Sequence, residues 1–71
     1  MIKKIKLASV ADIKEFNRTA CGYEGDVGVH SESAVIDAKS LLGLMTLDFS
    51  KPMVCVTEDE GFYRRIKTFL A

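Results

Sequence analysis

The chain has 71 residues, 48% of them hydrophobic and 28% charged, and its ten basic residues balance its ten acidic residues. A chain of this length buries about 60% of the surface that its unfolded form exposes, so we expect residues 1–71 to form one single domain. The balanced charge argues against nucleic acid and against an anionic membrane as partners, and no run approaches the roughly 20 apolar residues of a membrane span.

The start of the chain indicates where in the cell the protein is located, and this location indicates the state of its two cysteine thiols. Residues 1–6 alternate between apolar and basic side chains and lack the continuous apolar region of a signal peptide. We therefore expect a cytoplasmic protein, in which thiols stay reduced. Cys21 and Cys55 lack the spacing of metal ligands, so we expect two buried, unreactive thiols, no metal and no other cofactor.

The first strand and the first helix are predicted from their periodicity. Residues 2–7 alternate, with Ile5 and Leu7 on one side, which is typical of a strand. Ser9 stands where a helix N-cap is wanted, and Gly22 stands where a left-handed residue would end that helix. Between them, helical spacing relates four apolar residues, Val10, Ile13, Phe16 and Ala20.

A hairpin and a short helix are expected next. Val27 and Val29 alternate, a polar turn occupies residues 30–33, and an apolar run follows at 34–36, which together predict a hairpin. Ser40 is placed to cap the following helix, which we expect to end near residue 47. A glycine inside so short a helix costs about 1 kcal/mol relative to alanine, so Gly43 suggests the close approach of another group.

The last strand and the last helix lie beyond Pro52. Residues 53–56 are apolar, and two of the four are β-branched, as in a strand. Thr57 and Glu60 have the spacing of a capping box. The helix they introduce would have Phe62, Ile66, Phe69 and Leu70 on one face, with Tyr63, Arg64 and Lys67 projecting from other faces.

This order, β-α-β-β-α-β-α, predicts an α+β fold: a two-layer open-faced sandwich in which three helices cover one face of a four-stranded antiparallel sheet. The register of the last strand stays open. If Ile36, Met53 and Cys55 point into the core, the opposite face is partly apolar and favours self-association or a partner; its residues are then Ile2, Val35, Val54 and Val56. The other register places Cys55 on the open face and removes that argument.

The segment around Ser40 also resembles a known family. Residues 39–45 read Lys-Ser-Leu-Leu-Gly-Leu-Met, which is similar to the regulatory-serine segment of HPr, the phosphocarrier family of the bacterial sugar phosphotransferase system. Specific residues match only over 37–47, whereas the order of elements agrees along nearly the whole chain. The resemblance implies a single HPr-like domain with the sheet order 1-4-2-3.

The other hallmark of that family is missing. Its phosphoryl acceptor is a histidine at the mouth of the first helix, within a Gly-x-His-x-Arg-Pro-Ala pattern, whereas residues 7–12 here read Leu-Ala-Ser-Val-Ala-Asp. Asp12 places an anion where the phosphoryl group needs cations. His30 falls in the hairpin, where we expect a solvated side chain and neither a catalytic nor a metal-binding role. We therefore predict a domain that has lost phosphocarrier activity, has no catalytic residue and is not an enzyme.

What remains of the resemblance points to regulation and binding. In Gram-positive members a kinase phosphorylates the serine at this position, so Ser40 is the candidate regulatory site. The same helix helps to form the family's docking surface, which implies docking through Leu41, Leu44, Met45 and Leu47, with one or two of them exposed. The implied partner is a protein of the phosphotransferase system or a transcriptional regulator. Two alternatives stay open: a phosphoryl-transfer protein with an unusual acceptor, and a homodimeric scaffold that uses the open sheet face.

Overall fold

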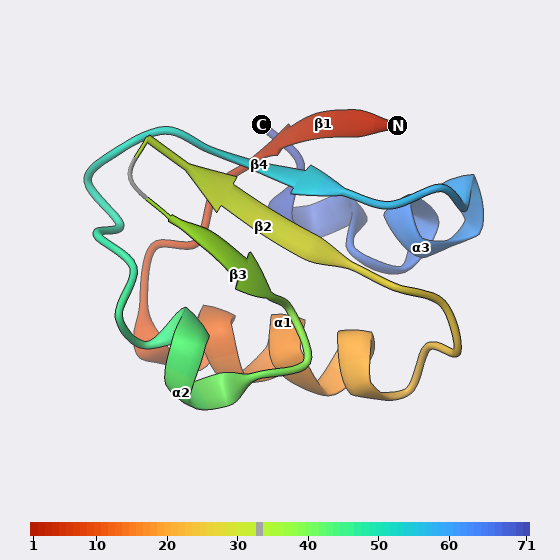
Figure 1. The fold of residues 1–71 in the computed structure, drawn as a ribbon, viewed down its shortest axis with the longest axis horizontal. Coiled ribbons are helices and arrows are strands. Elements are labelled where there is room, and N and C mark those ends of the chain that lie inside the picture. Colours follow the sequence, from red (N-terminus) through yellow and green to blue (C-terminus); the bar gives the residue numbers. More distant parts are fainter. Residues whose placement is uncertain (33) are drawn as a thin grey trace.

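A computed structural model describes residues 1–32 and 34–71. Within these residues the chain forms four strands, three α-helices and one short 3-10 helix (Figure 1). In chain order they are β1 (Ile2–Ile5), α1 (Val10–Cys21), β2 (Gly28–Ser31), β3 (Val35–Asp37), α2 (Leu41–Leu44), β4 (Met53–Val56), α3 (Glu60–Arg65) and the 3-10 helix Lys67–Phe69. The predicted order of elements is confirmed.

The strands form one antiparallel sheet in the order β1-β4-β2-β3. β4 is a central strand, and its Cys55 lies between Lys3 on β1 and Val29 on β2. The three α-helices lie on one side of this sheet (Figure 1). The predicted α+β two-layer sandwich and the sheet order 1-4-2-3 are therefore confirmed.

The core lies between the sheet and the helices, and Phe16 of α1 is at its centre. The Phe16 ring meets Phe62 and Phe69 edge-on, with ring centroids 6.0 and 6.2 Å apart. Such edge-to-face pairs contribute beyond the area that they bury. The sheet supplies fully buried Val29 and Cys55 from neighbouring strands, so side chains of both layers meet in one core.

The ends of α1 differ in how well the sequence predicts them. Ser9 caps the helix as predicted, since its Oγ accepts a hydrogen bond from the Asp12 N–H at 3.2 Å. Gly22 was expected in the left-handed region and is right-handed instead, with φ −82°. The reason is that the Tyr23 N–H donates back to the Ala20 carbonyl, so a tight right-handed turn closes the helix.

The first residue of α1 was also expected in the core. Val10 is 45% exposed, while Ile13, Phe16 and Ala20 are buried. Val10 directly follows the cap, at the tip of the helix. Periodicity places it on the apolar stripe but says nothing of how far the sheet extends beneath that stripe.

The entry to α3 differs from the predicted capping box. Asp59 is the N-cap, and its Oδ1 accepts from the Gly61 N–H at 2.7 Å. Thr57 is buried, and its Oγ1 donates to the Asp26 carbonyl at 3.0 Å. The Thr57 hydroxyl is therefore committed to the loop before β2, and the helix starts two residues later than the pattern suggested.

Tyr63 was expected on an outer face of α3 and is buried instead, with 2% of its surface exposed. Its hydroxyl lies 2.7 Å from the Cys55 carbonyl and 2.9 Å from the Met1 carbonyl. A buried tyrosine needs such acceptors for its O–H. The backbone next to β1 and within β4 supplies these acceptors, so the Tyr63 ring can lie in the core with its hydroxyl hydrogen-bonded.

The two thiols are in different environments. Cys55 is fully buried, and burial raises the pKa of its thiol from 9.0 to about 11. Cys21 is exposed at the end of α1, with its Sγ 3.6 Å from the Lys39 carbonyl. The prediction of two buried thiols is therefore wrong for Cys21, because the last turn of α1 presents it beside the loop before α2 instead of to the sheet.

Candidate functional site

The backbone around Ser40 is fixed by a tight turn after β3. The Asp37 carboxylate accepts from the Lys39 N–H at 2.9 Å, and the Asp37 carbonyl accepts from the Ser40 N–H at 2.9 Å. The Ser40 Oγ then accepts from the Gly43 N–H at 3.1 Å, as expected of an N-cap. The predicted helix cap is confirmed, and the Ser40 residue is exposed.

Gly43 explains why no larger residue stands inside this short helix. A Cβ on Gly43 would lie 2.9 Å from the Ile36 Cγ2 and 3.1 Å from the Ser40 Oγ. The first distance is shorter than any ordinary carbon–carbon contact, and the second would crowd the cap. The close approach inferred from the sequence is therefore made by Ile36 of β3 and by the cap itself.

The apolar side chains of α2 divide into two groups. Leu44 and Leu47 are buried in the core, with 0% and 7% of their surfaces exposed, so of the four residues expected to dock a partner these two face the sheet. Leu41 and Met45 are 38% and 43% exposed, and Leu42 is 84% exposed. These three exposed residues, Leu41, Leu42 and Met45, are called here the α2 patch.

Sequence reasoning missed Leu42 because it is absent from the i, i+3, i+4 stripe of this helix. Leu44 follows Leu42 by two positions, which places the two side chains about 200° apart around a helix. When Leu44 points into the core, Leu42 must point to solvent. Leu47 was assigned to the helix, but α2 ends at Leu44, and the turn that follows carries Leu47 back into the core.

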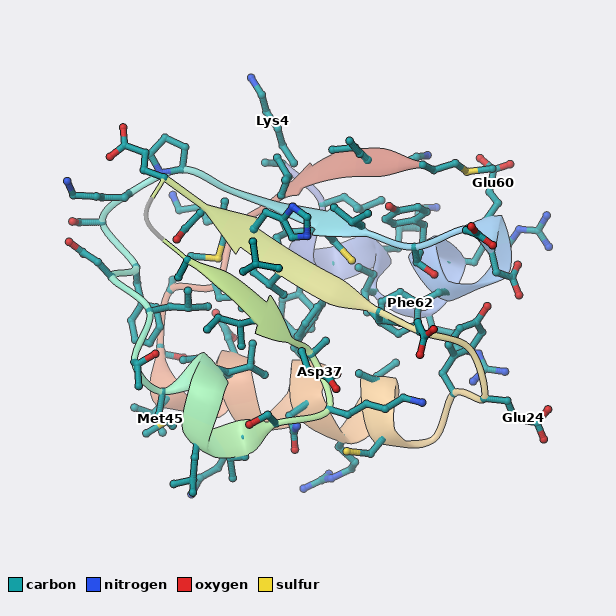
Figure 2. All side chains as sticks on the ribbon, in the orientation of Figure 1. Lys4, Glu24, Asp37, Met45, Glu60 and Phe62 are labelled. Carbon is teal, nitrogen blue, oxygen red and sulfur yellow. The ribbon has the colours of Figure 1, made fainter. Side chains whose placement is uncertain are left out.

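The α2 patch is held against α1. The Asn17 side chain donates to the Ala38 carbonyl at 3.0 Å, which ties the middle of α1 to the loop before α2. Figure 2 shows Asp37 at the end of β3 and Met45 at the far end of α2, beside α1. The serine and the apolar patch are therefore presented by a rigid turn and helix on the outer side of the helical layer.

The N-terminus of α1, where HPr has its phosphoryl-accepting histidine, is already occupied here. The Asp12 carboxylate accepts from the Ala8 N–H at 2.9 Å, while the Asp12 N–H donates to Ser9. The two side chains thus satisfy the Ala8 and Asp12 N–H groups, in the manner of a capping box. Both side chains at this helix end therefore act as caps.

His30 lies elsewhere. It belongs to β2, where it pairs with Val35 on β3 and Val54 on β4, and it is half-buried. The polar turn expected at residues 30–33 is therefore placed too early, since His30 and Ser31 extend the strand; Ser33 lies outside the described residues. Within residues 1–32 and 34–71, no group of three or more His, Cys, Asp or Glu residues is arranged to hold a metal ion.

The register of β4 decides what the open face of the sheet contains. Met53 and Cys55 are buried with 3% and 0% of their surfaces exposed, whereas Val54 and Val56 are half-buried. Of the two registers considered from the sequence, the one that points Cys55 into the core is therefore the observed one. The open face carries Val54, Val56 and their neighbours on the adjoining strands.

Comparison with known proteins adds the fold relationship. No family model and no curated protein matches the sequence. The crystal structure of a phosphocarrier protein HPr from Bacillus anthracis str. Ames is similar, with a TM-score of 0.68 over 100% of this chain and 94% of that chain, at 14% sequence identity. The chain has an HPr-like fold. Of its described helices, none has both the length and the apolar content that crossing a membrane requires.

Proposed function

We propose that this HPr-like domain is a regulatory binding module of the cytoplasm. It docks a protein partner through the α2 patch, and phosphorylation of Ser40 switches that docking. The partner is a protein of the phosphotransferase system or a transcriptional regulator. The domain carries no phosphoryl group on its first helix and is not an enzyme.

One observation supports this function above the others. The exposed Ser40 leads directly into a helix that leaves Leu41, Leu42 and Met45 open to solvent. A side chain as apolar as Leu42 gains by burial against a partner at roughly 25 cal/mol per Å² of apolar surface removed from water. The Ser40 hydroxyl, which gains negative charge when it is phosphorylated, thus adjoins the apolar α2 patch.

The physical effect of the modification follows from charge. A phosphate on Ser40 adds about −1.5 to −2 charges at neutral pH and three strong hydrogen-bond acceptors. Its oxygens can replace the Ser40 Oγ as acceptors for the Gly43 N–H, so the helix keeps its cap. The α2 patch is then bordered by a dianion, which a partner must either pair with a basic side chain or avoid.

The test uses matched variants of the patch. Leu42→Ser removes the most exposed apolar side chain of α2, and Val35→Ser makes the same kind of change at an equally exposed position on the sheet, 74% exposed. Proteins captured from lysate by the wild type are identified, and their affinities are measured with purified components. We expect Leu42→Ser to lose binding and Val35→Ser to keep it.

Ser40 is tested with the same partner. Ser40→Asp keeps an acceptor at the cap, and Ser40→Ala removes it at a cost of about 1 kcal/mol in stability. Regulation requires Ser40→Asp to change the partner's affinity by about tenfold or more, which corresponds to 1.4 kcal/mol, while the melting temperature stays near that of the wild type. If both variants bind the same proteins with the same affinity as the wild type, Ser40 is only a helix cap.

A further inference from the structure

The open face of the sheet presents two parallel rows of side chains. Across the strands in the order β1, β4, β2 and β3, the first row is Lys4, Val54, His30 and Val35, and the second row is Ile2, Val56, Gly28 and Asp37. Val35 and Ile2 are 74% and 67% exposed, which is unusual for a β-branched side chain on a sheet. The centre of this face carries the half-buried Val54 and Val56 of β4 beside His30 and Gly28 of β2.

The two ends of the same face carry opposite charges. Beyond the first row is a hollow of about 610 Å³, whose lining includes Lys4, Lys6 and Lys51. Beyond the second row is a hollow of about 750 Å³, whose lining includes Asp26, Glu58 and Asp59 together with the Met1 ammonium, which donates to the Thr57 carbonyl. Lys51 pairs with Glu32 at 3.5 Å, whereas Lys4 extends away from the sheet (Figure 2).

We propose that this open face is the interface of a homodimer, in which a second copy of the chain packs its own open face against it. The two-fold axis lies between the sheets and runs across the strands. Such an axis places the first row of one copy over the second row of the other. The basic end of each copy then meets the acidic end of its partner, twice.

The side chains on the two central strands fit this exchange of rows. Val54 faces the second copy's Val56, so the apolar centres meet. The imidazole of His30 faces Gly28 of the second copy, where the missing side chain leaves room for the ring. A two-fold interface must be self-complementary, and a face with an apolar centre between two ends of opposite charge satisfies that condition.

The surface that such a dimer needs is a modest share of the chain. An interface of ordinary size takes about 800 Å² from each partner, which is roughly a sixth of the 4587 Å² of surface on this chain. Stacked sheets align within about 30° of each other, so the strands of the two copies would run nearly along one another. Since the apolar centre is small, we expect dissociation in the micromolar range.

The first experiment measures self-association by sedimentation equilibrium from low micromolar to near-millimolar concentration. Val35→Glu places a carboxylate opposite Asp37 of the second copy and should raise the dimer dissociation constant by about tenfold or more, or 1.4 kcal/mol. Leu42→Glu is the matched control, because Leu42 is equally exposed but lies on α2. It should leave the dissociation constant unchanged.

A second experiment uses the charged ends. Lys4→Glu and Glu58→Lys should each weaken the dimer, and the double variant should restore it, since each end again meets its opposite. Added salt should weaken the wild-type dimer, because exposed charge pairs are screened. A monomer at every concentration, a dimer weakened by Leu42→Glu but not by Val35→Glu, or a different protein captured on this face without self-association would each overturn the proposal.

Discussion

The carboxylate of Asp12 accepts a hydrogen bond from the backbone N–H of Ala8 at 2.9 Å and so closes the N-terminus of α1. In the HPr family that helix end receives a phosphoryl group on a histidine. Here an anion already occupies the position, and the neighbouring Ser9 hydroxyl accepts from the Asp12 N–H. The start of α1 is thus closed by two of its own side chains.

The first prediction concerns phosphoryl transfer. Incubation with phosphoenolpyruvate and enzyme I should leave no acid-labile phosphate on the purified domain, because an acidic cap stands where the imidazole and cations are needed. An HPr phosphocarrier labelled in the same reaction serves as the positive control. Stoichiometric labelling that disappears in His30→Ala would contradict this prediction and would identify β2 as the site of an unusual acceptor.

The second prediction concerns Gly43. Gly43→Ala gains about 1 kcal/mol of helix propensity, but its Cβ would lie 2.9 Å from the Ile36 Cγ2 and would crowd the Ser40 cap. Overpacking costs about 1–3 kcal/mol and loss of a cap about 1 kcal/mol. We therefore expect a net loss of about 1–3 kcal/mol in urea unfolding.

Gly22 provides the control for that experiment. A Cβ there would meet only the Arg18 and Thr19 carbonyls, at 3.6 and 3.7 Å, and the backbone is right-handed. Gly22→Ala should keep or slightly raise stability. If Gly43→Ala were equally well tolerated, the approach of Ile36 to α2 would have to be looser than described.

The third prediction separates two residues of the apolar stripe on α1. Phe16 is fully buried and Val10 is 45% exposed. Phe16→Ala should cost about 3–5 kcal/mol through lost burial and the cavity left behind, whereas Val10→Ala should change stability by less than about 0.5 kcal/mol. Thermal melting followed by circular dichroism distinguishes the two, and similar losses for both would contradict the assigned helix face.

The fourth prediction concerns alkaline pH. Burial raises the pKa of the Cys55 thiol from 9.0 to about 11, so the folded state holds this proton more tightly than the unfolded state does. Stability is fully present below pH 9 and falls as pH rises towards 11, with a slope approaching about 1.4 kcal/mol per pH unit. Burial also raises the pKa of Tyr63, which acts in the same direction at higher pH.

Cysteine variants identify the group responsible. Cys55→Ala should flatten the decline between pH 9 and 11, and Cys21→Ala should leave it unchanged, because Cys21 is exposed. A thiol reagent added to the folded protein should modify Cys21 quickly and Cys55 only on unfolding. Equal rates for the two thiols would show that Cys55 is less buried than described.

The sequence predicted those features that depend on local chemistry or on strict alternation. Ser9 and Ser40 are predicted as caps because a serine oxygen just before an apolar helix can accept a hydrogen bond from a free N–H of the first turn. The strands were assigned from period-2 runs, and their order followed from a resemblance carried by eleven residues. Alternation could not choose the inward side of β4, because Val54 and Cys55 are both apolar.

The features that the sequence did not predict depend on partners distant in the chain. Thr57 resembles a cap, but the Asp26 carbonyl takes its hydroxyl, which leaves capping to Asp59. The helical pattern places Tyr63 on an outer face, but its hydroxyl is satisfied in the core by the Met1 and Cys55 carbonyls. At the candidate site the Ser40 cap was predicted, but the exposed Leu42 was not, since it lies outside the apolar stripe of the short helix.

The position of β4 between β1 and β2 also governs how the chain reaches this structure. β1 pairs with β4, a strand roughly fifty residues later in the sequence. Contacts between residues so far apart in the chain make folding slow. The β2–β3 hairpin has no second neighbour until β4 joins it. A chain truncated before Met53 therefore keeps its apolar side chains exposed and is open to chaperones and proteases, and folding proceeds as one step once residues 53–56 are free to insert.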